Sequence, residues 1–133
     1  MSVCLVTTTF SPTVDDMRAK LALKTAEEAR KAQFPLIVVE GSPDPKIGSE
    51  LSARGATVHR QEKPGMGNSR RQCLNLGLKT GADIIIWLEP EKHPMVPHLH
   101  PCINHLVSQE CEIVIPRRRT FTNYPQYQHY CEV

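Results

Sequence analysis

Five short apolar segments separated by stretches of helical character restrict most strongly how this chain can fold. The segments are predicted as strands over residues 3–10, 34–41, 56–61, 82–89 and 111–118. Residues 56–61 alternate in polarity, which indicates a strand near a sheet edge, whereas the others are apolar along most of their length. Uninterrupted apolar strands are typical of parallel sheets that helices cover on both faces. The pattern predicts a doubly wound, mostly parallel α/β sheet of about five strands, Rossmann-like, with helices on both faces.

Four helices are expected between these strands, over residues 13–33, 47–55, 68–81 and 96–109. Asp15 and Asp16 place negative charge where the first helix begins, which favours the helix dipole. Gly55 ends the second helix, and Asn68 or Ser69 is expected to cap the third. The fourth helix has only weak periodicity.

The composition is that of one globular domain covering residues 1–133. The chain has 133 residues, 40% of them hydrophobic and 23% charged, with a net charge of +2. This charge is too small to indicate a nucleic-acid partner. No apolar run is long enough to span a membrane and no signal peptide is recognised. The five cysteines form no CxxC motif, which favours reduced thiols and a cytoplasmic location.

Polar and glycine-rich residues lie at the carboxyl ends of four predicted strands, which meet at one edge of the sheet. They occupy residues 8–10, 40–44, 62–67 and 89–91. Ligands of open parallel sheets bind at the carboxyl ends of the strands. The residues that could carry chemistry are therefore expected along this edge.

The most apolar strand ends in Glu89-Pro90-Glu91. Two carboxylates one residue apart can bind a hard divalent cation such as Mg²⁺ or Mn²⁺, which takes oxygen ligands and completes its shell with water and phosphate. Pro90 stiffens the segment. The alternative is a solvated turn that contacts only water.

Two further segments could recognise a nucleotide. In residues 63–72, Gly65 and Gly67 let the backbone approach a phosphate, and Arg70 and Arg71 lie in the first turn of a helix, where an anionic ligand would explain them. The segment fits neither a Walker loop nor a dinucleotide fingerprint, and a solvated loop is the alternative. Residues 38–44 offer polar groups for a ribose or base, or form an ordinary turn.

Together these segments resemble the nucleotide-sugar-binding half of family-2-type glycosyltransferases, which have the A-type, nucleotide-diphospho-sugar transferase fold. The motifs are "LVTTTFSP", "VVEGSPD", "PGMGNSRRQCLNLGL" and "IIIWLEPEK", and they extend from about residue 3 to residue 92. In this family the last motif usually ends in Asp-x-Asp, so "EPEK" is a divergent form.

The resemblance implies a donor site for a UDP- or GDP-linked sugar with Mn²⁺ or Mg²⁺. Glu89 and Glu91 match the Asp-x-Asp pair, with Glu91 the direct metal ligand, and Arg71 would face the diphosphate or the sugar. The residues implied in nucleotide-sugar binding are Thr8, Thr9, Phe10, Glu40, Ser42, Asp44, Gly65, Gly67, Arg70 and Arg71.

The family also has a second half that binds the acceptor, and this chain is expected to lack it. No catalytic base is assigned for that reason. The expected function is metal-dependent binding of a nucleotide sugar for glycosyl transfer. The alternative is a non-catalytic or truncated nucleotide-sugar-binding domain, or an oligomerising scaffold. An incomplete sheet exposes an edge strand that invites pairing with another copy, so a homo-oligomer is predicted.

Two other hypotheses are less well supported by the sequence. His98, Cys102 and His105 share one helical face and suggest zinc, but Pro97 and Pro101 disturb that register. Residues 116–121 with Tyr124 could follow an RNA backbone, although a solvated strand end is the more common use of such a segment.

Overall fold

The computed structural model describes residues 1–117. Residues 1–99 form one compact unit, and the chain from residue 100 onward belongs to a second. The described strands and the candidate site lie in the first unit. In the second, α4 (Leu99–Ser108) is a ten-residue helix that begins at the boundary.

The first unit is built on a four-stranded parallel sheet of β1 (Val3–Thr9), β2 (Leu36–Glu40), β3 (Thr57–Arg60) and β4 (Ile84–Trp87). The strand order is β3-β2-β1-β4 and every neighbouring pair is parallel. The predicted Rossmann-like α/β fold is confirmed at this level. The order reverses between β1 and β4, because β2 and β3 are added on one side of β1 and β4 on the other.

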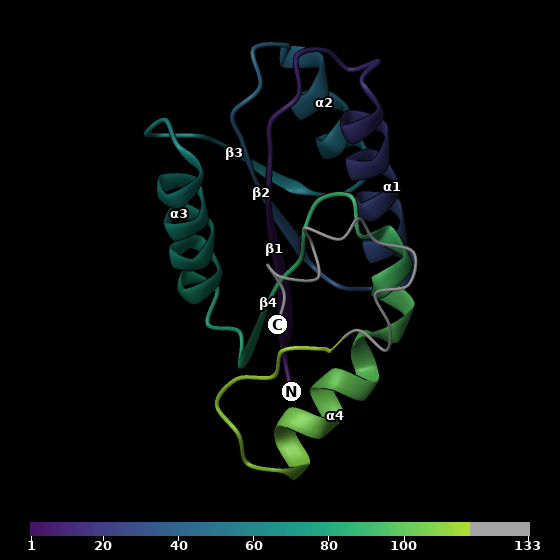
Figure 1. Cartoon of the computed structure of the whole chain (residues 1–133), viewed down its shortest axis with the longest axis vertical. Helices are drawn as coiled ribbons and strands as arrows, with labels where there is room; N and C mark the ends of the chain where they lie inside the picture. The colour runs from purple at the N-terminus through teal and green to yellow at the C-terminus, as the bar shows by residue number, and fades with distance from the viewer. Residues whose placement is uncertain (118–133) are drawn as a thin grey trace, which may run out of the picture. The chain divides into compact units, whose positions relative to one another are not determined.

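Helices cover the two faces of this sheet. The helices α1 (Met17–Lys31) and α2 (Pro45–Ala53) lie on one face, and α3 (Met66–Lys79) lies on the opposite face (Figure 1). Right-handed crossovers require this arrangement, since the chain moves outward from β1 to β3 and then returns across the sheet to β4. The 3₁₀ helix η1 (His93–His98) follows β4 and packs on α1.

Small residues allow the helices to approach the sheet closely. The buried face of α1 is made mainly of Ala19, Ala22, Ala26 and Ala29. On the α3 side, a Cβ at Gly77 would lie only 3.1 Å from Val6 Cγ1 and 3.3 Å from Ile85 Cγ2. The core on this side consists of Cys4, Val6, Ile37, Val39 and Cys73. The close packing of helices on both faces explains why the strands lack polar alternation.

The predicted fifth strand is wrong in its described part. Residues 111–117 contain no strand, and the side chains of Ile113 and Ile115 are 74% and 84% exposed. A β-branched run forms a strand only where a neighbouring strand supplies hydrogen-bond partners, and none of the described strands pairs with residues 111–117. The part of the chain that the structure describes therefore has four strands rather than five.

Helix boundaries also differ from the prediction. The third helix begins at Met66 with Gly65 as its N-cap, earlier than the predicted caps Asn68 and Ser69. No side chain caps this N-terminus. The predicted fourth helix is divided into η1 and α4. None of the described helices is both long enough and apolar enough to cross a membrane.

Candidate functional site

A cleft of about 520 Å³ lies at the carboxyl ends of β1 and β4. The N-terminus of α3 and the first turns of α1 complete its walls. This is the point where the strand order reverses, and open α/β sheets bind their ligands at such points. The cleft is lined by Thr8, Thr9, Phe10, Ser11, Arg18, Ala22, Gln61, Pro64, Gly65, Met66, Ser69, Glu89, Pro90 and Glu91.

Glu89 and Glu91 both line the cleft from a tight turn after β4. The N–H of Lys92 donates to the Glu89 carbonyl at 3.0 Å, which closes the turn with Pro90 in its second position. The Thr25 hydroxyl, on α1, donates to the Pro90 carbonyl at 2.6 Å. Proline at this position and the bond to α1 together fix where the two carboxylates lie.

One arginine contacts Glu89, and a second lines the cleft. Arg70 Nη2 lies 3.7 Å from Glu89 Oε1, and the Arg70 guanidinium lies 5.2 Å from the centre of the Trp87 ring. Arg18 lines the cleft from α1. Among the described residues no ion pair involves the Arg18 side chain. The cleft therefore has an exposed cation that could meet an anionic ligand.

The N-terminus of α3 opens on the same cleft through Gly65 and Met66. Gly65 has φ 106° and ψ 142°, a conformation that side chains other than glycine rarely adopt. Because no side chain caps this helix, its first N–H groups have no partner from a capping side chain. Such groups are well suited to bind phosphate or carboxylate oxygens.

Glutamines fix the loop between β3 and α3. Gln72 accepts from the Glu62 N–H at 2.9 Å and donates to the Arg60 carbonyl at 2.8 Å. Gln61 Nε2 donates to Ser69 Oγ at 2.5 Å. These bonds tie the loop to the first two turns of α3 and hold that wall of the cleft in place.

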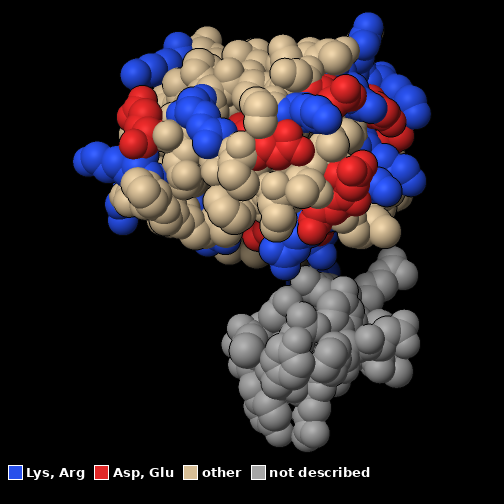
Figure 2. All heavy atoms as spheres, turned by 90° about the horizontal axis from the view of Figure 1, so that it is seen from above, with Lys and Arg blue, Asp and Glu red and all other residues tan. Residues whose placement is uncertain are grey.

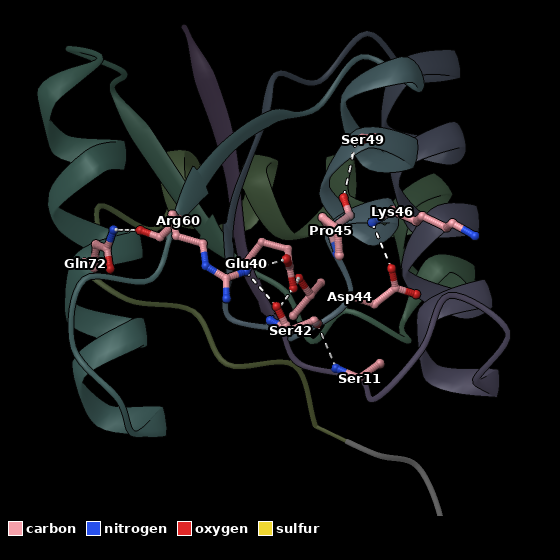
Figure 3. Close-up of polar contacts among 10 residues, drawn as sticks. Ser11, Glu40, Ser42, Asp44, Pro45, Lys46, Ser49, Arg60 and Gln72 are labelled. Carbon is pink, nitrogen blue, oxygen red and sulfur yellow. Dashed lines mark hydrogen bonds and ion pairs between the residues drawn. The ribbon is translucent and has the colours of Figure 1, made fainter.

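Glu40 and Ser42 lie beside the cleft in a buried polar cluster (Figure 3). The Glu40 side chain is 3% exposed; its carboxylate accepts from the Ser42 N–H at 2.6 Å and from Arg60 Nη1 at 3.1 Å. Arg60 also donates to the Ser42 carbonyl at 2.7 Å. Ser42 Oγ accepts from the Ser11 N–H at 2.8 Å. The Thr9 hydroxyl donates to Glu40 Oε1 at 3.4 Å. The cluster therefore supports the cleft through two of its lining residues, Thr9 and Ser11.

Asp44 is the N-cap of α2. It accepts from the Lys46 N–H at 3.0 Å and from the Val14 N–H at 2.9 Å. These two backbone hydrogen bonds, that of Lys46 first, lower the pKa of the Asp44 carboxyl. Asp44 thereby joins the loop after β1 to the start of α2.

The structure brings half of the predicted site residues together in one cleft. The lining residues that the sequence predicted are Thr8, Thr9, Phe10, Gly65, Glu89 and Glu91. Those that lie outside the lining are Glu40, Ser42, Asp44, Gly67, Arg70 and Arg71, although Arg70 contacts Glu89. The sequence analysis missed Arg18. This residue could have been predicted to line the cleft, because the helix after β1 begins at the same edge of the sheet.

Other candidate chemistry is not assembled in the described residues. Within residues 1–117, no group of three or more His, Cys, Asp or Glu side chains is arranged to hold a metal. This includes His98, Cys102 and His105, the set for which zinc was the less well supported hypothesis. The segment considered for RNA binding lies mostly outside the described residues, since Phe121 and Tyr124 follow residue 117.

Charges of both signs surround the strand ends. Figure 2 views the molecule from the top of Figure 1, where the loops after β1 and β2 lie. On this face acidic and basic side chains are interspersed rather than gathered by sign. The surface shown thus resembles a mixed protein surface more than a basic groove for nucleic acid.

No protein-family model matches the chain, and no curated protein matches it either.

Proposed function

We propose that the cleft binds a nucleotide-diphosphate sugar together with Mg²⁺ or Mn²⁺, as the donor site of a glycosyltransferase-like domain. One observation carries this proposal: a pair of carboxylates and an uncapped helix N-terminus line the same cleft, at the point where the strand order reverses. A cation and a phosphate could therefore be bound next to each other.

The size and chemistry of the cleft support a ligand of this class. Its volume of about 520 Å³ falls among those of small-molecule sites, roughly 300–1,000 Å³. The α3 N-terminus would bind the diphosphate, and Arg18 and Arg70 would add positive charge. Phe10, which is 64% exposed at the rim, offers an apolar surface for a base.

The residues present fit a cation that keeps part of its water shell. Glu89 and Glu91 supply two oxygen-bearing side chains, and Mg²⁺ commonly uses one or two carboxylates with water and substrate phosphates as its other ligands. When bound, such a cation neutralises negative charge that develops on a diphosphate leaving group. Arg70 would then move its charge from Glu89 toward the diphosphate.

Calorimetric titration with UDP- and GDP-linked sugars, with and without Mn²⁺, tests the proposal. We expect binding that requires the metal and that Glu91→Gln weakens at least tenfold, since the cation loses a charged ligand. Glu62→Gln is the matched control, because Glu62 is exposed and does not line the cleft. Wild-type affinity in a folded Glu91→Gln variant would refute the metal site.

A separate assay for the released nucleotide distinguishes the two functions. Metal-dependent binding with nucleotide release, by transfer to an acceptor or to water, would support a glycosyltransferase. Binding without release would support the alternative, a donor-binding domain without catalysis. A folded protein that binds none of these sugars would refute both.

A further inference from the structure

One edge of the sheet is open and uncharged. Within residues 1–117, β4 pairs only with β1. The Ile84 N–H donates to the Ser2 carbonyl and the Leu88 N–H to the Val6 carbonyl, both at 3.1 Å. Because successive residues of a strand point their backbone groups in opposite directions, the N–H and C=O groups of Ile85 and Trp87 point away from β1. These groups can form main-chain hydrogen bonds with another strand.

The opposite edge, β3, is better protected. It carries His59 and Arg60, and Arg60 is held across the strand end by Glu40 and Ser42. Charged side chains on an edge strand are a common protection against pairing with another chain. By contrast, β4 and the residue after it, Ile-Ile-Ile-Trp-Leu, carry no charge, proline or glycine. If another strand is added to this sheet, β4 is the favoured edge.

Exposed leucines lie beside the same edge. Arg70 of α3 stands over Trp87 of β4. Leu74 and Leu78 follow Arg70 at intervals of four residues and so continue the same stripe of the helix. Their side chains are 42% and 66% exposed. An apolar stripe on α3 therefore lies beside the open edge. Strand pairing alone would not explain why these leucines are exposed.

We propose that two copies of this chain associate about a two-fold axis, with β4 antiparallel to β4 of the second copy. The register that pairs only apolar residues places Ile86 opposite Ile86, and Ile85 opposite Trp87. Each Ile85–Trp87 pair would exchange two main-chain hydrogen bonds, about four in all. The stripes of Leu74 and Leu78 then lie on the same face of the joined sheet and cover the new pairing.

A second copy is the partner that this surface fits best. A two-fold interface brings the same residues of both chains together, so it requires a self-complementary surface, and an uncharged strand flanked by leucines is self-complementary. Beyond the paired apolar residues, at each end of the proposed pairing, Asp83 would face Glu89 of the second copy. These like charges repel each other and limit the pairing to the apolar residues. Because salt screens the repulsion, association is expected to strengthen as salt is added.

Light scattering and sedimentation of the full chain over a range of concentrations test the proposal. We expect a dimer, and at least a tenfold larger dissociation constant for Leu78→Glu. Leu78 is mostly exposed, so this variant is expected to fold. The matched control is Ile113→Glu, which places the same charge on an exposed apolar residue of the second unit and should leave dimerisation unchanged.

Cross-linking tests the register. Opposed residues of a non-hydrogen-bonded antiparallel pair have Cα atoms about 4.5 Å apart, within the range of disulfides, roughly 4.4–6.8 Å. Diamide should therefore join Ile86→Cys chains above the wild-type background, whereas Thr57→Cys on β3 should not be joined. A monomer at every concentration would overturn the proposal, as would equal cross-linking at both positions. Neither outcome depends on a ligand in the cleft.

Discussion

Replacing Glu40 by Gln tests whether this residue stabilises the fold or contacts the ligand, as the sequence predicted. The carboxylate is buried; Oε1 accepts from the Ser42 N–H and, at 3.4 Å, from the Thr9 hydroxyl, and Oε2 accepts from Arg60. A glutamine keeps one acceptor oxygen but turns an NH₂ group either toward Ser42 and Thr9 or toward Arg60. At least one charge-assisted hydrogen bond is lost in either orientation.

The structure sets the size of the effect. A hydrogen bond to a charged group contributes about 1.5–3 kcal/mol. The Arg60 side chain is 63% exposed and can return to water, which reduces its share to that of a surface ion pair, about 1 kcal/mol or less. We therefore expect Glu40→Gln to lower the free energy of unfolding by about 1–3 kcal/mol.

Urea unfolding followed by circular dichroism measures this change. Glu50→Gln is the control, because Glu50 forms an ion pair with Arg54 at the surface, and we expect a loss below about 1 kcal/mol. A cycle of Glu40→Gln and Arg60→Met should give a coupling energy of roughly 0.5–1 kcal/mol. If Glu40→Gln unfolds like the wild type but loses nucleotide-sugar affinity, the structural argument is wrong and Glu40 contacts the ligand.

Three further predictions concern pH and backbone conformation. Because the pKa of Asp44 is lowered in the folded chain, its carboxylate stabilises the fold above the unfolded pKa, about 3.9, and this effect is lost as the pH falls through the folded pKa. Asparagine at position 44 can still cap α2 but does not titrate. Asp44→Asn should therefore make the free energy of unfolding by urea depend less on pH between pH 2.5 and 6. Burial raises the pKa of the Cys73 thiol to about 11. Mass spectrometry should therefore find Cys73 unlabelled by iodoacetamide at pH 8 until urea unfolds the chain. The free energy of unfolding should also decline as the pH rises toward about 11. Gly65→Ala should lower the free energy of unfolding by urea by about 1–3 kcal/mol, because Gly65 has a positive φ. Gly81→Asn is the control and should cost less, since asparagine tolerates the φ of 74° at that position. Equal losses of unfolding free energy in the two variants would show that a side chain at position 65 does not strain the backbone.

The fold could be predicted because its signal is local. Each strand of the parallel sheet is a short apolar run bounded by loop residues, and the order of elements permits few arrangements. The fifth strand failed for the opposite reason. Residues 111–117 have the composition of a strand, but a strand also needs a neighbour, and a neighbour is a property of the fold and not of the segment.

The cleft could be predicted only where topology alone determines position. Thr8 lies at the carboxyl end of β1 and Glu89 shortly after β4, so a parallel sheet in which these strands are neighbours brings them together. Arg18 could also have been expected there, because the helix after β1 begins at the same edge of the sheet. Gln61, by contrast, reaches the cleft from a loop whose direction depends on packing. Glu40 illustrates a third case: it lies at the carboxyl end of a strand as predicted, but its carboxylate is hydrogen-bonded to Thr9, Ser42 and Arg60. A polar residue at a strand end can therefore be required by the loop rather than by a ligand.

Arg70 connects the two proposals. It contacts Glu89, which lines the cleft, and Trp87, which lies on the open edge. With atoms 3.7 Å apart and both side chains about half exposed, the ion pair with Glu89 contributes at most about 1 kcal/mol. A divalent cation, which carries twice the charge, can displace it at little cost. The stacking on Trp87 does not depend on Glu89 and would keep Arg70 at the cleft after the exchange. In the proposed site, Arg70 would thus pair with Glu89 before a cation binds and would stay close enough to contact the diphosphate afterwards.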